Sequence, residues 1–178
     1  MSIRALIVDP AAPAALRLGD IDDPAPRPHQ TVIDVRHISL NRGEIAFARQ
    51  QAPGTVLGYD ASGIVSRAAA DGSGPAVGTR VAAFGAGAWA QRMAVGTDSV
   101  AEIPDEVDLA DAAALPMAGV TALRTLRAAP ILGKRVLIWE RSEHRLGLRR
   151  AGCVRAVLAL LNRPVQVDEH LRRRHRVR

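Results

Sequence analysis

The stretch that decides the fold is Leu57-Gly58-Tyr59-Asp60-Ala61-Ser62-Gly63-Ile64-Val65. Its two glycines and the small residues between them let another backbone segment or a ligand come close. We expect a short strand over residues 59–66, one of several that glycines separate. Gly63 can serve a turn, a close contact with a neighbouring segment or a contact with a ligand, and the sequence leaves these alternatives open.

Other short strands surround this one. We expect strands over residues 3–8, 16–18, 31–40, 80–84, 89–95 and 100–103, with 16–18 as the antiparallel partner of 3–8. Within 31–40, Ile33, Val35 and His37 alternate with Val32, Asp34 and Arg36, which predicts a half-buried strand. We also expect a short helix over residues 44–51. Glycines separate most of these strands, a pattern typical of a small closed or folded-over β architecture.

After residue 107 the spacing of the apolar residues changes from one that favours strands to one that favours helices. Asp108 predicts a helix N-cap with Asp111 three residues later, followed by a helix over 110–115. A second helix is expected from Pro116, and a strand over 135–138. A helix that leads into an apolar strand is typical of the entry to a parallel α/β sheet.

Composition excludes several classes of protein. The single cysteine, Cys153, rules out an internal disulfide and a zinc cluster built from cysteines. No run of 18 apolar residues occurs, and Asp9 falls where a signal peptide would be apolar. We therefore expect a cytoplasmic protein without a membrane segment.

Four segments together resemble the medium-chain dehydrogenase/reductase superfamily, in its zinc-independent, quinone-oxidoreductase-like branch. They are His37-Ile38-Ser39-Leu40-Asn41-Arg42-Gly43-Glu44, the stretch 57–65, Val77-Gly78-Thr79-Arg80-Val81 followed by Gly87-Ala88-Trp89-Ala90-Gln91, and Leu115-Pro116-Met117-Ala118-Gly119-Val120-Thr121-Ala122. The resemblance covers residues 1–138, the N-terminal portion of such a protein. It implies a mainly β fold with helices: a GroES-like β-barrel over residues 1–115, then the first helix and strand of a truncated Rossmann domain over 116–138.

The resemblance also implies a chemistry. Zinc-using relatives have a catalytic histidine where this chain has Tyr59, and residues 1–138 contain no cysteine. The zinc-free branch passes hydride from NADPH to a quinone or an enone, so the implied cofactor is NADP(H) and the implied partner is a small molecule.

Two residues match cofactor contacts of the family. Asn41 matches an asparagine near the nicotinamide, and its alternative role is to cap the helix that contains Glu44. Thr121 matches a threonine beside the cofactor, and its alternative is a hydroxyl bonded to its own helix. Many relatives have a tyrosine near the substrate where this chain has Ala46. No catalytic residue is assigned, and no metal is expected.

The segment after Ile138 lacks the glycine-rich turn that receives the pyrophosphate in this family. Trp139, Glu140, Arg141, Ser142 and Glu143 stand there instead. We therefore expect weak NADPH binding or none, and no turnover by this chain alone.

Residues 139–178 form an Arg-rich tail with 11 arginines, no lysine and 4 acidic residues, whereas residues 1–138 have a net charge of −1. Our hypothesis is that the tail is an irregular or disordered out-of-frame translation, because shifted Gly and Ala codons of a GC-rich gene encode arginine. Two alternatives are a non-catalytic remnant or interaction module built on the β domain, and a basic nucleic-acid-binding module. Nucleic acid is disfavoured because the tail has one aromatic residue and no known binding motif. The sequence leaves the substrate and the oligomeric state open.

Overall fold

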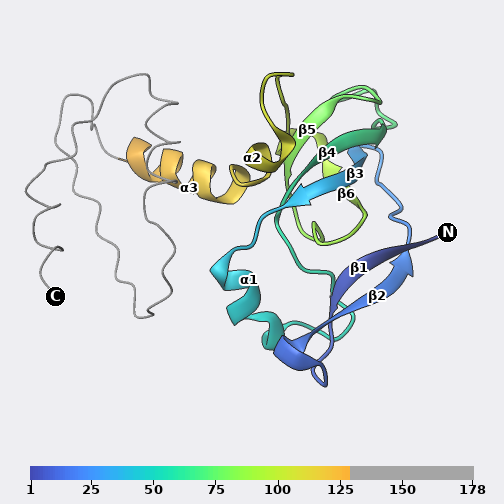
Figure 1. Cartoon of the computed structure of the whole chain (residues 1–178). Coiled ribbons are helices and arrows are strands. Elements are labelled where there is room, and N and C mark those ends of the chain that lie inside the picture. Colours follow the sequence, from blue (N-terminus) through green and yellow to red (C-terminus); the bar gives the residue numbers. More distant parts are fainter. Residues whose placement is uncertain (129–178) are drawn as a thin grey trace, which may run out of the picture. The chain divides into compact units, whose positions relative to one another are not determined.

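The computed structural model describes residues 1–128 (Figure 1). The strand expected over 135–138 and the Arg-rich tail lie outside the described residues. The chain divides into two units, Met1–Val120 and Thr121–Arg178, and every described strand lies in the first.

A five-stranded antiparallel sheet forms the centre of this unit. Its order is β6 (Arg92–Gly96), β3 (Gln30–Ile38), β4 (Asp60–Arg67), β5 (Arg80–Phe84) and β7 (Val100–Glu102). Each of these strands lies within two or three residues of a predicted one. β4 contains most of the glycine-rich stretch 57–65. It pairs with both β3 and β5 and therefore lies in the middle of the sheet.

A separate two-stranded ribbon consists of β1 (Ser2–Val8) and β2 (Leu16–Asp22), paired antiparallel as predicted. Isolated bridges join β1 to the rest of the unit, at Ala5 with Ala90 and at Ile7 with Val56. The Leu6 N–H also donates to the Trp89 carbonyl at 2.8 Å. The ribbon is thus held by backbone hydrogen bonds as well as by its buried side chains.

The alternation expected in β3 is wrong. Thr31, Val32 and Ile33 are all buried, at 0–2% exposure. The register with β4 shifts between Val32 and Ile33 and again between Val35 and His37, as β-bulges do. The extra residue is Ser66 of β4 at the first shift and Arg36 of β3 at the second, so the two-residue period of β3 is interrupted at Arg36. The three buried residues precede that bulge, and β3 is therefore buried on both faces over this segment.

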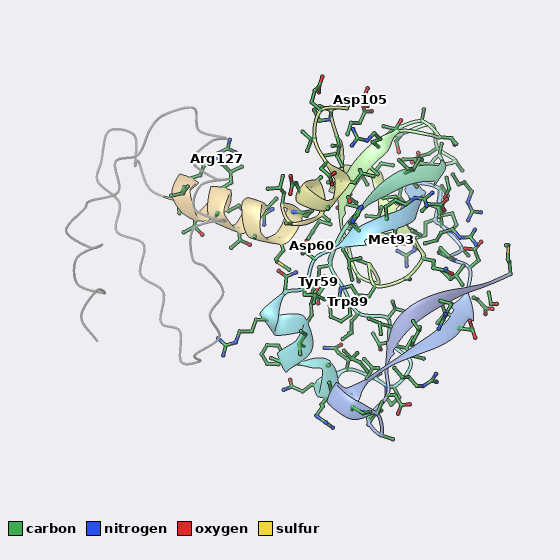
Figure 2. All side chains as sticks on the ribbon, in the orientation of Figure 1. Tyr59, Asp60, Trp89, Met93, Asp105 and Arg127 are labelled. Carbon is green, nitrogen blue, oxygen red and sulfur yellow. The ribbon has the colours of Figure 1, made fainter. Side chains whose placement is uncertain are left out.

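The core collects apolar side chains from four strands of the sheet and from the segment that precedes β6. Its fully buried members include Ile33, Val65 and Val81, packed with Trp89 and Met93 (Figure 2). Burying such side chains stabilises a fold by about 1.5–3 kcal/mol each.

Residues 1–128 contain three α-helices: α1 (Arg42–Ala46), α2 (Leu109–Ala113) and α3 (Pro116–Arg127). The predicted helix over 44–51 is split, because α1 ends and a 3₁₀ turn (Ala48–Gln50) follows. The predicted Asp108 cap is present, with its carboxylate accepting the Ala110 N–H at 2.6 Å. The predicted fold class, mainly β with helices, is confirmed.

The turn between β1 and β2 stores backbone strain. Ala14 and Ala15 have φ of 56° and 60°, the left-handed region that favours glycine. Because Ala14 is exposed, Ala14→Gly is expected to raise the free energy of unfolding by about 0.5–1 kcal/mol, measured by urea denaturation. Ala12→Gly, at an ordinary φ of −81°, should instead be neutral or destabilising, and equal effects of the two changes would contradict this account.

Candidate functional site

A buried carboxylate organises the end of the sheet at which β3 ends and β4 begins. Asp60, the first residue of β4, is 0% exposed. One carboxylate oxygen accepts hydrogen bonds from Ser39 Oγ at 2.6 Å and from Asn41 Nδ2 at 2.9 Å. The other accepts the Met117 N–H at 2.8 Å. Three donors compensate the desolvation of the charge, and they come from segments far apart in the sequence.

The bond from Met117 makes Asp60 the cap of a helix. Pro116 begins α3, and Leu115 before it has no side-chain acceptor for the free N–H groups of the first turn. A carboxylate at this position satisfies one of those donors and interacts favourably with the positive end of the helix dipole. The start of α3 therefore depends on a residue of β4.

Glu44 is a second buried carboxylate, at 6% exposure. It accepts the Asn41 N–H at 2.6 Å and the Tyr59 N–H at 2.7 Å. The first bond belongs to a capping box in which Asn41 and Glu44 satisfy each other's backbone groups. The second ties α1 to the residue before β4.

Asn41 therefore fills the capping role that the sequence offers as one of its two readings. Its side chain closes the capping box and also donates to Asp60. Asn41 is half-buried, and its hydrogen bond to Asp60 anchors the amide at the end of the sheet where β4 begins. Contact with a nicotinamide stays a prediction for this residue.

Thr121 lies in α3 and is exposed. Its carbonyl accepts a hydrogen bond from Thr125 Oγ1 at 2.8 Å. Thr121 is the first residue of the second of the two units. Its contact with a cofactor also stays a prediction.

Tyr59 forms an exposed pair with Phe84. The two rings are stacked, with centroids 6.1 Å apart and an angle of 29° between their planes. Gly58 fixes the backbone that precedes the tyrosine: its φ is +98°, and a Cβ there would lie 2.3 Å from a ring carbon of Trp89. Only glycine fits such a position.

Gly63 serves close packing, one of the alternatives that the sequence leaves open. A Cβ on Gly63 would lie 2.1 Å from the Asp34 carbonyl oxygen and 2.9 Å from an Ile33 methyl group. The neighbouring strand β3 occupies the space that a side chain would need.

Within residues 1–128, His, Cys, Asp and Glu side chains form no group of three or more that could hold a metal ion. Among the helices of this part of the chain, none has both the length and the apolar character needed to cross a membrane.

Known proteins similar to this chain fall into two groups. Among curated proteins, the highly reducing polyketide synthase claI of Penicillium crustosum is 34% identical over 109 residues, and the lovastatin diketide synthase lovF of Aspergillus terreus is 36% identical over 112 residues. Each alignment covers 60% of this chain but only 5% of the synthase. The chain thus matches a small part of these large proteins.

Among solved structures, a quinone oxidoreductase from Coxiella burnetii matches with a TM-score of 0.67 and 26% identity, over 72% of this chain and 45% of that protein. The human synaptic vesicle membrane protein VAT-1 homolog-like protein matches with 0.67 and 30%, over 71% and 43%. A third, from Rhizobium etli, is described as a zinc-dependent alcohol dehydrogenase protein and matches with 0.67 and 30%, over 76% and 43%. The chain spans less than half of each of these proteins.

The alcohol dehydrogenase GroES-like domain matches residues 27–105, which include β3 to β7 and the Asn41–Glu44–Asp60 network. The likeness to quinone oxidoreductase structures agrees with the resemblance that the sequence motifs carry. Residues 27–105 of this chain therefore match the alcohol dehydrogenase GroES-like domain, the N-terminal kind of domain that the sequence motifs indicate.

Proposed function

We propose that this chain supplies the substrate-side domain of a zinc-independent, NADP(H)-dependent oxidoreductase of the quinone reductase type. The reaction is hydride transfer from NADPH to a quinone or an enone. The domain holds the substrate against the nicotinamide and keeps water away, and the cofactor supplies the hydride.

The observation that carries this proposal is the hydrogen-bonded network around the buried Asp60 carboxylate. Asn41, the residue that the family resemblance places near the nicotinamide, is held at 2.9 Å from the Asp60 carboxylate, and Tyr59 stands where zinc-using relatives have histidine. A network of buried polar groups beside an exposed aromatic side chain suits a site where a flat substrate lies against a cofactor.

We further propose the domain boundaries 1–115, 116–138 and 139–178, with the cofactor-binding domain beginning at Pro116. Asn41 and Thr121 are the proposed cofactor contacts. The residues after 138 lack the glycine-rich turn that would bind the pyrophosphate, so this chain is proposed to be inactive by itself.

The full chain is expected to show no saturable binding of NADPH in the micromolar range and no oxidation of NADPH in the presence of a quinone. The physical reason is that Glu140 and Glu143 stand where backbone N–H groups would have to approach an anion. Titration followed by NADPH fluorescence and absorbance measures both. Micromolar binding would contradict the proposed loss of the cofactor site.

A chimera tests the positive part of the proposal. Residues 1–115 of this chain, joined to the cofactor-binding part of the Coxiella burnetii quinone oxidoreductase, should oxidise NADPH in a quinone-dependent manner. The same chimera with Asn41→Ala should bind NADPH more weakly and turn over more slowly, because Asn41 is a proposed cofactor contact and is held by the Asp60 carboxylate at 2.9 Å. A folded chimera that binds NADPH and does not reduce any quinone would count against the proposed function.

A further inference from the structure

A surface cavity lies between the β1–β2 ribbon and β3, two parts of the fold that Figure 1 shows. Its volume is about 310 Å³, at the lower end of the range for small-molecule sites. No residue of the Asp60 network lines it. Its apolar lining comes from both sides, with Leu6 and Leu18 of the ribbon, Val35 and Ile38 of β3, and Trp89.

Backbone hydrogen bonds fix this cavity, because the short segment before β6 is bonded on both of its sides. Toward the ribbon, the Leu6 N–H donates to the Trp89 carbonyl at 2.8 Å and the Gln91 N–H donates to the Arg4 carbonyl at 2.9 Å. Toward β3, the Gln91 carbonyl accepts an N–H at 2.9 Å. The Trp89 indole N–H is engaged by the Ser39 carbonyl at 3.3 Å, so this residue offers the cavity its apolar ring. A preformed site lowers the entropy that binding costs.

The polar groups of the cavity are hydrogen-bond donors. Arg4 and Gln91 both line it. The Arg4 N–H donates to Gln91 Oε1 at 2.9 Å, which turns the amide oxygen toward the backbone and leaves the NH₂ group to donate. Within residues 1–128, the Arg4 guanidinium makes no ion pair and no hydrogen bond. A guanidinium presents a planar fork of donors that matches the two oxygens of a carboxylate.

Asp20 is the acidic side chain that competes for this guanidinium. It is the Cα partner of Arg4 in the ribbon, so the two side chains share one face. Among the described residues, however, these two form no ion pair within 4 Å, and both are exposed. Because water screens exposed charges that are not in contact, Asp20 weakens a bound anion without replacing it.

We propose that this cavity binds an aliphatic carboxylate, with the alkyl chain on the apolar side chains and the carboxylate on Arg4 and Gln91. Each part of the ligand follows from its surroundings. Donors without a free acceptor select an anionic head group, and leucine, valine and isoleucine side chains select an aliphatic body. The inference goes beyond the proposed oxidoreductase function and does not depend on it, because neither Asn41 nor Thr121 lines the cavity.

Octanoate is the probe, and the Trp89 indole signal is the reading. The chain has two tryptophans, so the full chain with Trp139→Phe gives a single indole ¹H–¹⁵N signal, that of a residue in the cavity wall. Octanoate is expected to shift this signal saturably with a Kd of about 1 mM, as suits a ligand of this size. Octan-1-ol, which lacks the charge, should bind about tenfold more weakly, and acetate, which lacks the chain, should not shift the signal.

Arg4→Gln is expected to raise the octanoate Kd about tenfold and to leave the octan-1-ol Kd unchanged. Asp20→Asn should lower the octanoate Kd, because it removes the competing carboxylate. Arg49→Gln is the matched control, since Arg49 is exposed and does not line the cavity, and it should leave the octanoate Kd unchanged. Leu18→Ser, a second variant, should weaken octanoate and octan-1-ol alike. A ¹H–¹⁵N spectrum of each variant verifies folding.

Four results would overturn the inference. The first two are the lack of a saturable shift with octanoate and equal affinities for octanoate and octan-1-ol. The third is equal weakening by Arg4→Gln and Arg49→Gln, which would attribute binding to the positive charge of the whole chain. The fourth is a shift of the Trp89 signal on dilution without ligand, which would assign the cavity to contact with a second copy. The chimera tests the proposed function separately, because it measures quinone-dependent oxidation of NADPH.

Discussion

Asp60→Asn is expected to lower the free energy of unfolding by about 3 kcal/mol or more, since hydrogen bonds to a charged group contribute about 1.5–3 kcal/mol each. The carboxylate accepts three donors at 2.6–2.9 Å while fully buried. An amide of the same shape turns its NH₂ group toward at least one of these donors. The measurement is urea denaturation followed by circular dichroism, with hydrogen exchange at the Met117 N–H as a local reading of the first turn of α3.

Asp20→Asn provides the matched control, because Asp20 is an exposed carboxylate on β2. This change should alter the unfolding free energy by no more than about 0.5 kcal/mol. A loss of less than about 1 kcal/mol for Asp60→Asn, with unchanged exchange at Met117, would contradict the central role of the carboxylate.

Gly63→Ala is expected to destabilise the sheet by about 3 kcal/mol, the upper part of the range for overpacking. The added Cβ would lie 2.1 Å from a backbone oxygen of β3, and a backbone atom cannot move aside as the end of a flexible side chain can. The two strands would have to separate near the second bulge, where Val35 pairs with Gly63. Thermal or urea unfolding measures the loss.

Gly43→Ala tests the same chemical change in open surroundings. Gly43 lies in α1, where a Cβ would meet only a Phe47 ring carbon at 3.9 Å, an ordinary contact. Alanine favours a helix over glycine, so this variant should be unchanged or more stable by about 0.5 kcal/mol. Equal destabilisation by both changes would show that the packing at Gly63 is not the cause.

The strands could be predicted because glycines separate short β-branched segments, and the Asp108 cap could be predicted because its geometry is local. The bulges between β3 and β4 could not, since they depend on how two strands that are distant in the sequence pair. A strand that alternates in sequence becomes buried on both faces where neighbours cover it.

The candidate site was predicted only in part. Asn41 and Glu44 are three residues apart, so their capping box is visible in the sequence. Asp60 receives donors from residues 39, 41 and 117, and no local pattern connects them. The available signal was an acidic residue among small and apolar residues of a strand, which indicates a buried charge that needs partners. The stacking of Tyr59 on Phe84 depends on the β4–β5 register and was likewise invisible.

The order of strands in the sheet has a consequence for synthesis of the chain. β3 pairs with β6, so Gln30 faces Gly96 across the ladder although 65 residues separate them in sequence. Pairings between such distant segments form slowly, because the long loop must close before contacts compensate its entropy. A nascent chain shorter than about 96 residues leaves one edge of β3 without its partner, and unpaired edges promote aggregation. We therefore expect this sheet to form more slowly than one whose neighbouring strands follow one another in the sequence.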